Sequence, residues 1–529
     1  MTNSIPEIRD ADFLFVIGSN TSEAHPIIAM EMKRAVGRGA TMVVADPRAV
    51  WMTTIAEKHL QIAPGSDVWL LNAMAHVIVT EGLVDQSFID EHTENFESVR
   101  ETVMRYTPEE AERVTGISAD DIRWVARRYA TTEKAGIYYT LGITEHICGV
   151  DNVQSLCNLA LMTGNLGKEG AGINPMRGQN NIQGAGDCGA LPNNYPGFQP
   201  VHLEENQRKF EEAWGVQVDL EKGITKVRAL ETCGEKIFSM LICGENTVVT
   251  DPDMDHCRHA LQSLDHLVVV DMFLTETAQL ADVVLPASGW GETDGVFTNT
   301  ERRPQRVRAA VPPQGEAQPD WWIMSQIAKR LGSDQFEYES ARDVFNEMCS
   351  LATTYNGLDW DRIEGGAYQW PVPDKDHPGT PVLHIGEFPR GKGLFMTPDY
   401  RDPAEVVDDD YPVWLTTGRR LAHYHTRTMS GRSVGTEYLV PEELVEVHPD
   451  DVTSWGLEDG GLAVMSSRRG EVVVKVSADD TSPRGTVFCS FSFSDVPVNK
   501  LTGSGYDPIT DTAELKVCAV KIEPVTTEL

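Results

Sequence analysis

The stretch that decides the fold is DFLFVIGSNTSEAHPIIAMEMKRAVGRGATMVVADPR, which spans residues 12–48. It begins with a continuous apolar run ending in Gly-Ser-Asn and closes with a second apolar run ending in Asp-Pro-Arg. Between them, apolar residues recur at the spacing of an amphipathic helix from about His25 to Val36. Apolar strands that alternate with helices indicate a parallel sheet covered on both faces. The stretch therefore predicts an α/β fold.

The same alternation extends outward along the chain. In the first third we expect another strand at residues 136–142 and helices at residues 68–80, 108–114, 120–130 and 153–162. In the middle we expect strands at residues 237–246, 266–277 and 281–287, with helices at residues 321–331 and 341–351. Two such series predict two Rossmann-like, doubly wound units.

The last part of the chain changes character. From about Tyr411, six short β runs (VWLTTG, LVEVHP, GLAVMSS, EVVVKVS, GTVFCSFSF and KVCAVKIEP) are separated by turn residues. This pattern predicts a closed, barrel-like β-domain. The segment before it is rich in proline, glycine and aspartate and predicts an irregular connector. The expected domains are residues 1–179 and 180–357 for the two Rossmann-like units, 358–410 for the connector and 411–529 for the barrel.

Composition excludes several classes of function. The 529 residues include 45 Lys and Arg against 80 Asp and Glu, a formal net charge of −35 that argues against nucleic acid and anionic membranes as partners. No apolar run is long enough for membrane insertion. The nine cysteines form no C-x-x-C pair, which excludes the usual zinc and iron–sulfur spacings within this chain. Scattered thiols without an export signal predict a cytoplasmic protein.

A second stretch points to chemistry. Residues 164–197 read GNLGKEGAGINPMRGQNNIQGAGDCGALPNNYPG and contain one arginine, Arg177. Because glycine weakens both helices and strands, we expect neither a regular helix nor a central strand here. Glycine also allows backbone to approach a ligand closely, and a single guanidinium can pair bidentately with a small anion. The stretch predicts a binding site for such an anion.

Polar residues at the ends of the predicted strands indicate nucleotide binding. Gly-Ser-Asn at residues 18–20 and Asp-Pro-Arg at residues 46–48 stand where a doubly wound sheet binds nucleotides. Gly-Glu-Asn at residues 244–246 and Asp-Met-Phe at residues 271–273 repeat the arrangement. Two parallel sets imply two nucleotide-like ligands or one dinucleotide. There is no G-x-G-x-x-G motif after a strand and no Walker motif, which argues against a nicotinamide site and a nucleotide hydrolase.

The segment MRGQNNIQGAGDCGALPNNYPG resembles the substrate-side loop of molybdenum- or tungsten-dependent formate dehydrogenases, in the dimethyl sulfoxide reductase superfamily of molybdopterin oxidoreductases. The resemblance covers nearly the whole chain. Further matching segments are PGSDVWLLNAM (residues 64–74), LGITEH (141–146), LADVVLPASGWGETDGVFTNTERRPQ (280–305) and LTTGRRLAHYHTRTMSGR (415–432).

The resemblance implies a bis-molybdopterin guanine dinucleotide cofactor, with molybdenum or tungsten held between two dinucleotides, one per Rossmann-like unit. Arg177 then orients formate as the catalytic residue during its reversible oxidation to carbon dioxide. The matching cofactor-binding residues are Gly18, Asn20, Glu23, His25, Asp46, Arg48, Asp67, Gly142, Glu145, Gly178, Gln179, Gly244, Glu245, Asn246, Asp271, Thr275, Thr277, Thr417, Gly418, Arg419, His425, Asn499 and Lys516. Asp67 stands where a guanine is read, and His146 and Cys148 are expected to line the site without binding the metal.

In the family, a preceding domain carries a 4Fe–4S cluster and a Cys-His or selenocysteine-His pair whose sulfur or selenium binds the metal. This chain opens at a segment that resembles the region shortly after that pair. We therefore expect an N-terminally truncated chain, read from after a selenocysteine codon or a gene fragment, and inactive in isolation. The resemblance also implies electron-transfer partner subunits, iron–sulfur or flavin- and NAD-linked.

Three alternatives stay open. The first is a nitrate or other oxyanion reductase of the same superfamily. The second is a non-catalytic module that binds the pterin cofactor or partner subunits. The third is a zinc pair at His423 and His425, whose H-x-H spacing on a strand would put both rings on one face. Zinc needs further ligands nearby, and cofactor contact or loop packing suits these histidines better.

Overall fold

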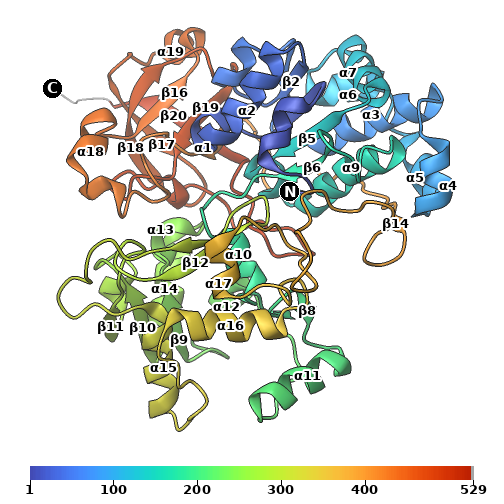
Figure 1. Ribbon diagram of the computed structural model, residues 1–529. Coiled ribbons are helices and arrows are strands. Elements are labelled where there is room, and N and C mark those ends of the chain that lie inside the picture. The colour runs from blue at the N-terminus through green and yellow to red at the C-terminus, as the bar shows by residue number, and fades with distance from the viewer. Residues whose placement is uncertain (526–529) are drawn as a thin grey trace. The chain divides into compact units, whose positions relative to one another are not determined.

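The computed structural model describes residues 1–525 of the chain (Figure 1). These residues form two compact units, each with its own sheet and core. Unit 1 contains Met1–Met176, Val249–Cys257 and the chain from Val382 onward, and unit 2 contains Arg177–Val248 and Arg258–Pro381. The domain boundaries expected at residues 179, 357 and 410 stay a prediction.

Unit 1 is built on a five-stranded parallel sheet with the order β3-β2-β1-β5-β6. Its strands are β1 (Phe13–Ile17), β2 (Thr41–Ala45), β3 (Lys58–Leu60), β5 (Ala135–Tyr139) and β6 (Gly172–Pro175). The chain fills one side of β1 first and the other side afterwards, so the strand order reverses between β1 and β5. Polar loops follow both of these strands, and a doubly wound sheet binds ligands at this switch point.

Helices surround this sheet, and five of them lie where the sequence predicts. They are α1 (Thr21–Ala24), α2 (Pro26–Gly37), α3 (Asp67–Thr80), α4 (Gln86–His92), α5 (Phe96–Val103), α6 (Pro108–Thr115), α7 (Ala119–Thr131), α8 (Leu141–Thr144) and α9 (Gly149–Met162). The expected helices at residues 25–36, 68–80, 108–114, 120–130 and 153–162 correspond to α2, α3, α6, α7 and α9 and are confirmed.

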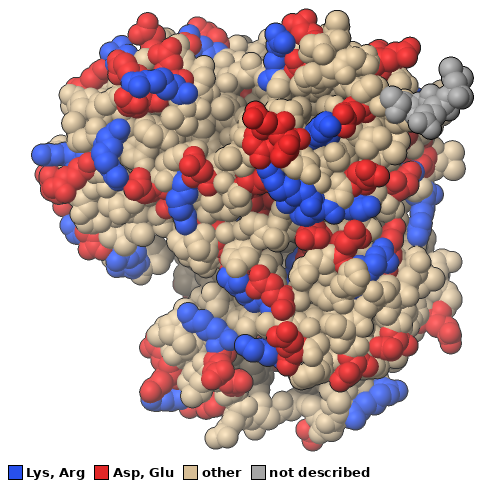
Figure 2. All heavy atoms as spheres, turned by 180° about the vertical axis from the view of Figure 1, so that it is seen from behind, with Lys and Arg blue, Asp and Glu red and all other residues tan. Residues whose placement is uncertain are grey.

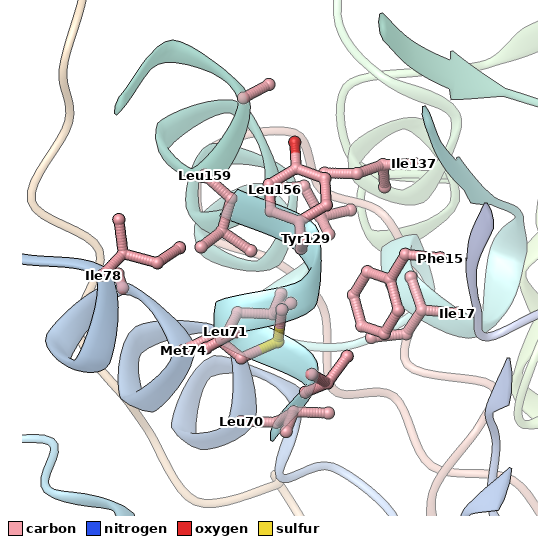
Figure 3. Close-up of a cluster of buried hydrophobic side chains, with 14 of the residues drawn as sticks. Phe15, Ile17, Leu70, Leu71, Met74, Ile78, Tyr129, Ile137, Leu156 and Leu159 are labelled. Carbon is pink, nitrogen blue, oxygen red and sulfur yellow. The ribbon is translucent and has the colours of Figure 1, made fainter. Parts of the chain in front are cut away.

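The side chains of β1 show why its sequence is apolar throughout. Phe13, Phe15 and Ile17 belong to the core beneath α3, α7 and α9, whereas Leu14 and Val16 belong to the core beneath α2. Figure 3 shows the first of these cores, a single cluster that contains Leu70, Leu71, Met74 and Ile78 of α3, Tyr129 of α7, and Phe15 and Ile17 of β1. A strand buried on both faces has no position for a polar residue.

Unit 2 contains a three-stranded parallel sheet with the order β11-β10-β9. The strands are β9 (Ser239–Cys243), β10 (His266–Asp271) and β11 (Val283–Pro286), which confirms the three strands expected in the middle of the chain. Helix α15 (Asp320–Arg330) packs Ile323 on Val270 of this sheet. A hairpin of β12 (Gly295–Thr298) and β13 (Pro304–Val307) lies with α10 (Ile182–Asp187), α16 (Ala341–Leu351) and α17 (Trp360–Gly365) around a second core.

Between the two sheets in sequence, the chain forms β7 (Asn194–Tyr195), β8 (Gln199–Pro200), α11 (Glu204–Trp214) and α12 (Lys226–Glu231). Helices α13 (Thr247–Thr250) and α14 (Met254–Gln262) follow β9. The expected helices at residues 321–331 and 341–351 correspond to α15 and α16. The mixed α/β class is therefore confirmed.

The C-terminal part of unit 1 is a closed barrel with the order β15-β19-β16-β18-β17-β20. Its strands are β15 (Val413–Gly418), β16 (Leu444–Val447), β17 (Leu462–Ser466), β18 (Glu471–Ala478), β19 (Thr486–Ser490) and β20 (Cys518–Pro524), with α18 (Val434–Leu439) and α19 (Pro449–Ser454) between them. Each of the six β runs forms one strand, so the predicted barrel is confirmed. Closure removes the exposed edges that an open sheet of short strands would present.

Two expectations about local structure were wrong in part. The glycine-rich stretch contains α10, because tertiary packing outweighs the low helix propensity of glycine there. It also contains β6, which is an edge strand and not a central one, as expected. The segment from 358 to 410 is mostly irregular but contains α17 and β14 (Gly393–Leu394), which pairs with β4 (Thr93–Glu94).

The surface carries charges of both signs. On the face shown in Figure 2, Lys and Arg side chains are scattered among Asp and Glu and form no extended basic area. Such an area is the usual footprint of a nucleic-acid-binding protein. Among the described residues, no helix combines the length and the apolar character needed to cross a bilayer.

Candidate functional site

Two loops meet at the switch point of the unit 1 sheet, where β1 and β5 end. The hydroxyl of Thr140 donates a hydrogen bond of 2.6 Å to the carbonyl of Gly18. A Cβ added to Gly18, whose φ is +56°, would lie 2.7 Å from the backbone of Gly142, and one added to Gly142 would lie 2.6 Å from the oxygen of Gly18. Only glycine permits this approach at both positions. The predicted residues Gly18 and Gly142 are thus in close backbone contact at the switch point, where a doubly wound sheet is expected to bind its ligand.

Asp46 follows β2 at the same edge of the sheet. Its carboxylate accepts a 3.0 Å hydrogen bond from the backbone N–H of Arg48, and its carbonyl lies 2.9 Å from Nε2 of His59. Burial raises the pKa of Asp46, although Arg48 and His59 act in the opposite direction. A partly buried carboxylate at this edge is a suitable acceptor for ligand hydroxyl or N–H groups.

Asp67, the first residue of α3, is a second carboxylate of the group and is buried. Burial raises the pKa of Asp67 to about 6, and the charge of Asp46 contributes to the rise. This interaction shows that the two predicted acidic residues lie close enough to influence each other. Their mutual repulsion would be relieved by a ligand that donates N–H groups.

His146 lies between two carboxylates, with Nε2 3.9 Å from Asp67 and Nδ1 3.8 Å from Glu514. Burial lowers the pKa of His146, but the two carboxylates outweigh this effect and the net direction is upward. Glu514 is itself fixed, because it accepts hydrogen bonds from the backbone of Ile147 (3.1 Å) and Ala404 (2.9 Å). His146 and Cys148, which the sequence suggested as lining residues, are both buried behind this edge.

A group of predicted residues from the barrel meets Glu145. Lys516 forms a 2.9 Å ion pair with Glu145 and donates a 3.1 Å hydrogen bond to the carbonyl of Thr417. Thr417 in turn donates its hydroxyl to the carbonyl of Leu515 at 2.7 Å. Burial lowers the pKa of Arg419, against the opposing effect of Glu145. The structure therefore brings together Glu145, Thr417, Arg419 and Lys516 from segments more than 250 residues apart.

Arg48 is engaged in a different contact. It forms an ion pair with Glu446 of β16, and Arg420 bonds the same carboxylate at 2.5 Å. Arg420 also bonds Glu443 at 3.1 Å, and Arg48 stacks 3.5 Å above the ring of Phe488. These contacts join the sheet of unit 1 to its barrel. As a cofactor-binding residue, Arg48 would have to act within this network.

The other predicted residues of unit 1 have individual placements. Glu23 lies in α1 and His25 stands between α1 and α2, in the segment that follows β1. Gly418 ends β15, where a Cβ would lie 2.6 Å from the ring of Phe488. Asn499 is buried and donates hydrogen bonds to the carbonyls of residues 249 (2.9 Å) and 250 (3.0 Å). Asn499 therefore anchors the segment that follows β9.

The H-x-H pair does not lie on a strand. β15 ends at Gly418, and both histidines lie in the turns that follow it. His423 is buried, and its Nε2 lies 2.6 Å from the carbonyl of Val440. The ring of His425, whose φ is +51°, lies 5.4 Å from that of Phe491. Since no group of three His, Cys, Asp or Glu side chains within residues 1–525 could hold a metal ion, loop packing is the better account of His423.

In unit 2, the predicted residues after β9 and β10 form one connected group. Asn246 donates a 2.7 Å hydrogen bond to Glu276, and its oxygen accepts from the backbone (3.2 Å) and hydroxyl (2.9 Å) of Thr277. Glu245 forms a 2.6 Å ion pair with Lys226. Asn246 and Thr277 thus hold the loops after the two strands together.

The remaining predicted residues of unit 2 lie beside this group. Burial raises the pKa of Asp271, the last residue of β10, although it accepts a 3.3 Å hydrogen bond from the backbone of Phe273. Thr275 caps the next turn by accepting a 3.2 Å hydrogen bond from the backbone of Ala278. Gly244 has a φ of +65° and no atom within 4 Å of the position of an added Cβ. A ligand could approach this backbone directly.

Arg177 lies on the exposed loop between β6 and α10, with Gly178 and Gln179 following it. Its backbone N–H donates to the hydroxyl of Thr300 (3.0 Å), and its Nε donates to Oε1 of Gln183 (3.2 Å). Gln183 is buried on α10 and donates from Nε2 to Oδ1 of Asp187 at 2.8 Å. The predicted anion-binding arginine is therefore connected to a buried carboxylate through one amide.

Asp187 is fully buried and is surrounded by donors. Its Oδ2 accepts hydrogen bonds from the hydroxyl of Tyr355 and from the indole N–H of Trp370, the latter at 2.8 Å. Arg302 holds the backbone of Trp370 in place, because its buried side chain donates hydrogen bonds to the carbonyls of Trp370, Thr380 (2.9 Å) and Pro381 (3.0 Å). These contacts join α10 to two segments more than 160 residues away in sequence.

Sequence reasoning missed this part of the site. The spacing of Gln183 and Asp187 by four residues was an available signal, because it places both on one helix face. We did not use this spacing because we expected no helix in the glycine-rich stretch. Arg302 stands in the matched segment ERRPQ, but nothing local distinguishes it from a surface arginine.

The residues of both units suit a dinucleotide. Each unit presents a parallel sheet with a glycine in the left-handed region after one strand, Gly18 or Gly244, and a partly buried carboxylate at the end of a neighbouring strand, Asp46 or Asp271. Close backbone approach suits a phosphate or pterin group, and an acidic side chain suits ribose hydroxyls or a guanine edge. The chemistry of the donors and acceptors therefore fits the expected cofactor.

Comparison with known proteins agrees with this assignment. Residues 1–330 match the model of the molybdopterin oxidoreductase family, and residues 413–519 match that of the molydopterin dinucleotide binding domain. The F420-dependent formate dehydrogenase subunit alpha of Methanocaldococcus jannaschii is 46% identical over 99% of this chain and 78% of its own length. Formate dehydrogenase H of Escherichia coli is 38% identical over 99% of this chain and 74% of its own length.

Among solved structures, acetylene hydratase from Pelobacter acetylenicus has a similar fold. Its TM-score is 0.79 at 20% sequence identity, and the match covers 98% of this chain and 80% of that protein. At such low identity the likeness concerns the fold alone. Because a family model matches more than half of the residues and relatives above 30% identity span nearly all of them, the chain belongs to the molybdopterin oxidoreductase family.

Proposed function

We propose that this chain is the catalytic subunit, or the larger part of one, of a formate dehydrogenase that oxidises formate reversibly to carbon dioxide. The observation that carries the proposal is the identity of 46% with a formate dehydrogenase alpha subunit over 99% of the chain. Two further relatives from Methanococcus maripaludis, at 43% and 44% identity, carry the same name. The match covers 78% of that relative's own length, so this chain supplies most of the segments of such a subunit.

The expected cofactor is a molybdopterin guanine dinucleotide pair with molybdenum or tungsten. When bound, it accepts the two electrons that leave formate as carbon dioxide forms and the proton is released. Asp46 and Asp67 of unit 1 and Asp271 of unit 2 would accept hydrogen bonds from the dinucleotides. Gly18 and Gly244 leave the strand ends accessible. A 4Fe–4S cluster and its cysteine ligands remain an expectation from the resemblance.

Arg177 is the residue of this chain that we assign to formate. A guanidinium matches a carboxylate with two parallel N–H groups, so it can hold both oxygens and direct the C–H bond toward the acceptor. The hydrogen bond from Nε of Arg177 to Gln183 supports this role. It holds one edge of the planar guanidinium, and the Nη1–Nη2 edge has the geometry that bidentate pairing needs. The remaining predicted residues keep their assignment as cofactor-binding.

The relatives from the two methanogens are F420-dependent by name, so coenzyme F420 is the first electron acceptor to test. As they are alpha subunits, we expect a partner subunit to carry electrons from this chain to that acceptor. Iron–sulfur and flavin- or NAD-linked partners are the other candidates.

Kinetics on the holoenzyme test the proposal. The enzyme is purified through a tag on this chain with the subunits that accompany it, and its molybdenum and tungsten contents are measured by mass spectrometry. We expect formate-dependent reduction of a viologen dye and no nitrate-dependent dye oxidation. Nitrate turnover without formate turnover would instead establish an oxyanion reductase, and a metal-loaded enzyme with neither activity would favour a non-catalytic module.

A further inference from the structure

For Arg177 to bind a small anion well, the orientation of its side chain must be restricted. It stands on an exposed loop followed by glycine, and an arginine side chain carries about 2 kcal/mol of rotamer entropy. A guanidinium that samples many orientations binds a small anion weakly, because ordering it opposes binding. A contact within unit 2 must therefore restrict the orientations of this guanidinium.

The restriction comes from a chain of two hydrogen bonds that begins in the core. Asp187 Oδ1 accepts from Gln183 Nε2 at 2.8 Å, and Gln183 Oε1 accepts from Arg177 Nε at 3.2 Å. Gln183 and Asp187 occupy one face of α10, four residues apart, and both are buried. The amide cannot be reversed without placing its oxygen against a carboxylate and its N–H groups against a guanidinium. Its orientation is thus set by the charges at its two ends.

Asp187 is held as firmly as the amide. Tyr355 and Trp370 both donate to its other oxygen, and Tyr355 lies 3.0 Å from the hydroxyl of Thr298 on β12. Burial raises the pKa of Asp187, and the donors from Tyr355, Gln183 and Trp370 and the charge of Arg177 oppose that rise. Arg177 is the cation that favours the charged form of this carboxylate.

We propose that Gln183 and Asp187 are positioning residues that orient Arg177 for formate. The carboxylate polarises the Gln183 amide, and the amide oxygen fixes Nε of Arg177, so that the guanidinium plane is set from the core of unit 2. This inference rests on the proposed function of Arg177. Neither residue touches the substrate.

The test is a cycle of substitutions in the holoenzyme. Gln183→Met keeps the length of the side chain and removes both hydrogen bonds. We expect the KM for formate to rise about tenfold while kcat changes less than threefold, the signature of lost substrate binding. Gln207→Met is the matched control, since Gln207 is another buried glutamine of unit 2 whose side-chain amide donates to the carbonyl of Val201 at 2.9 Å, and we expect unchanged KM.

Arg177→Lys decides whether Gln183 acts through the arginine. Lysine has no guanidinium Nε–H, so in this background Gln183→Met should change the KM by less than about twofold. If the role of Gln183 is only structural, Gln183→Met should raise the KM by the same factor in the native and the Arg177→Lys enzymes, and that outcome would overturn the proposal. Asp187→Asn should raise the KM alone but add nothing to Gln183→Met, because its effect passes through the same amide.

A second measurement does not depend on turnover. Formate raises the melting temperature of a protein that binds it, by an amount set by its affinity. We expect Gln183→Met to require about tenfold more formate than the native enzyme for the same rise, with Gln207→Met unchanged. If Arg177→Lys itself leaves formate kinetics and this rise intact, the proposed function of Arg177 fails. If Arg177→Lys raises the KM and weakens this rise, both still measurable, but the cycle is additive, only the positioning role fails.

Discussion

The buried ion network of the barrel allows a stability prediction that follows directly from its geometry. Glu443 has no exposed side-chain surface and pairs with Arg420 at 3.1 Å, while its carboxylate also accepts from the backbone (2.8 Å) and hydroxyl of Ser490. Arg420 bonds Glu446 as well, and Arg48 pairs with Glu446 from the opposite side. Arg420→Met keeps most of the volume and removes the charge that compensates Glu443.

Removal of one partner from a buried ion pair costs about 3–5 kcal/mol, because the other charge remains buried without compensation. Ser490 keeps its hydrogen bonds to Glu443 and Arg48 keeps its pair with Glu446, so we expect a value near the lower end, about 3 kcal/mol. In calorimetry this corresponds to a fall of roughly 6 °C in the transition that includes the barrel. Lys475→Met is the control, because its 2.7 Å pair with Glu442 is exposed and should contribute less than about 1 kcal/mol.

The pH dependence makes the prediction sharper. Burial already raises the pKa of Glu443, and loss of Arg420 raises it further. A carboxyl whose folded pKa exceeds its unfolded value binds more protons when folded, so stability falls as pH rises between the two values. The deficit of Arg420→Met should therefore be small near pH 4.5 and reach its full size above the new pKa.

Glu443→Gln in the Arg420→Met background removes the uncompensated charge and should restore most of the lost stability. Urea denaturation at pH 5 and pH 8 provides the measurement. A deficit below about 1 kcal/mol, a deficit that does not change with pH, or a double variant no more stable than Arg420→Met would each refute the reasoning.

Two further predictions concern the sites. Gly184→Ala would place a Cβ 2.2 Å from Oδ1 of Asn181, which is fixed by a 2.9 Å hydrogen bond from the backbone of Thr298. Helix α10 must then shift, and the KM for formate should rise about tenfold. Gly186→Ala has ordinary spacing around the new carbon and should leave the KM unchanged, so equal effects of the two substitutions would contradict the packing argument. Burial raises the pKa of Asp67 to about 6, so in the cofactor-free protein its titration should remove about 2 kcal/mol of stability as pH rises from 4 to 7, and Asp67→Asn should eliminate that contribution in urea denaturation.

Much of the fold is readable because its signals are local. The alternation of Phe13, Leu14 and Phe15 between two cores requires an apolar residue at every position, and the sequence shows that run directly. Helix α17 also had a local signal, since Asp359 caps it by accepting from the backbone of Arg362 at 2.8 Å. It was missed because the surrounding proline and glycine suggested an irregular connector.

The site was less predictable because its contacts join distant segments. Arg177 stands out in a glycine-rich stretch, but its support comes from Tyr355 and Trp370, which lie 168 and 183 residues beyond Asp187. No periodicity links such positions. Helix α10 forms against the local preference of its glycines because Gly184 allows it to lie close to β12, and this reason exists only in the folded protein.

The burial of Asp187 is itself an argument about function. A carboxylate without exposed surface destabilises a fold unless its charge is compensated, and burial does raise its pKa. Structure alone would be served as well by a neutral acceptor for the N–H of Trp370 and the hydroxyl of Tyr355. A charge has a further effect that a neutral acceptor lacks, because it polarises the Gln183 amide, which in turn bonds a guanidinium on an exposed loop. The cost of burying Asp187 is therefore best explained by the orientation that it gives to Arg177.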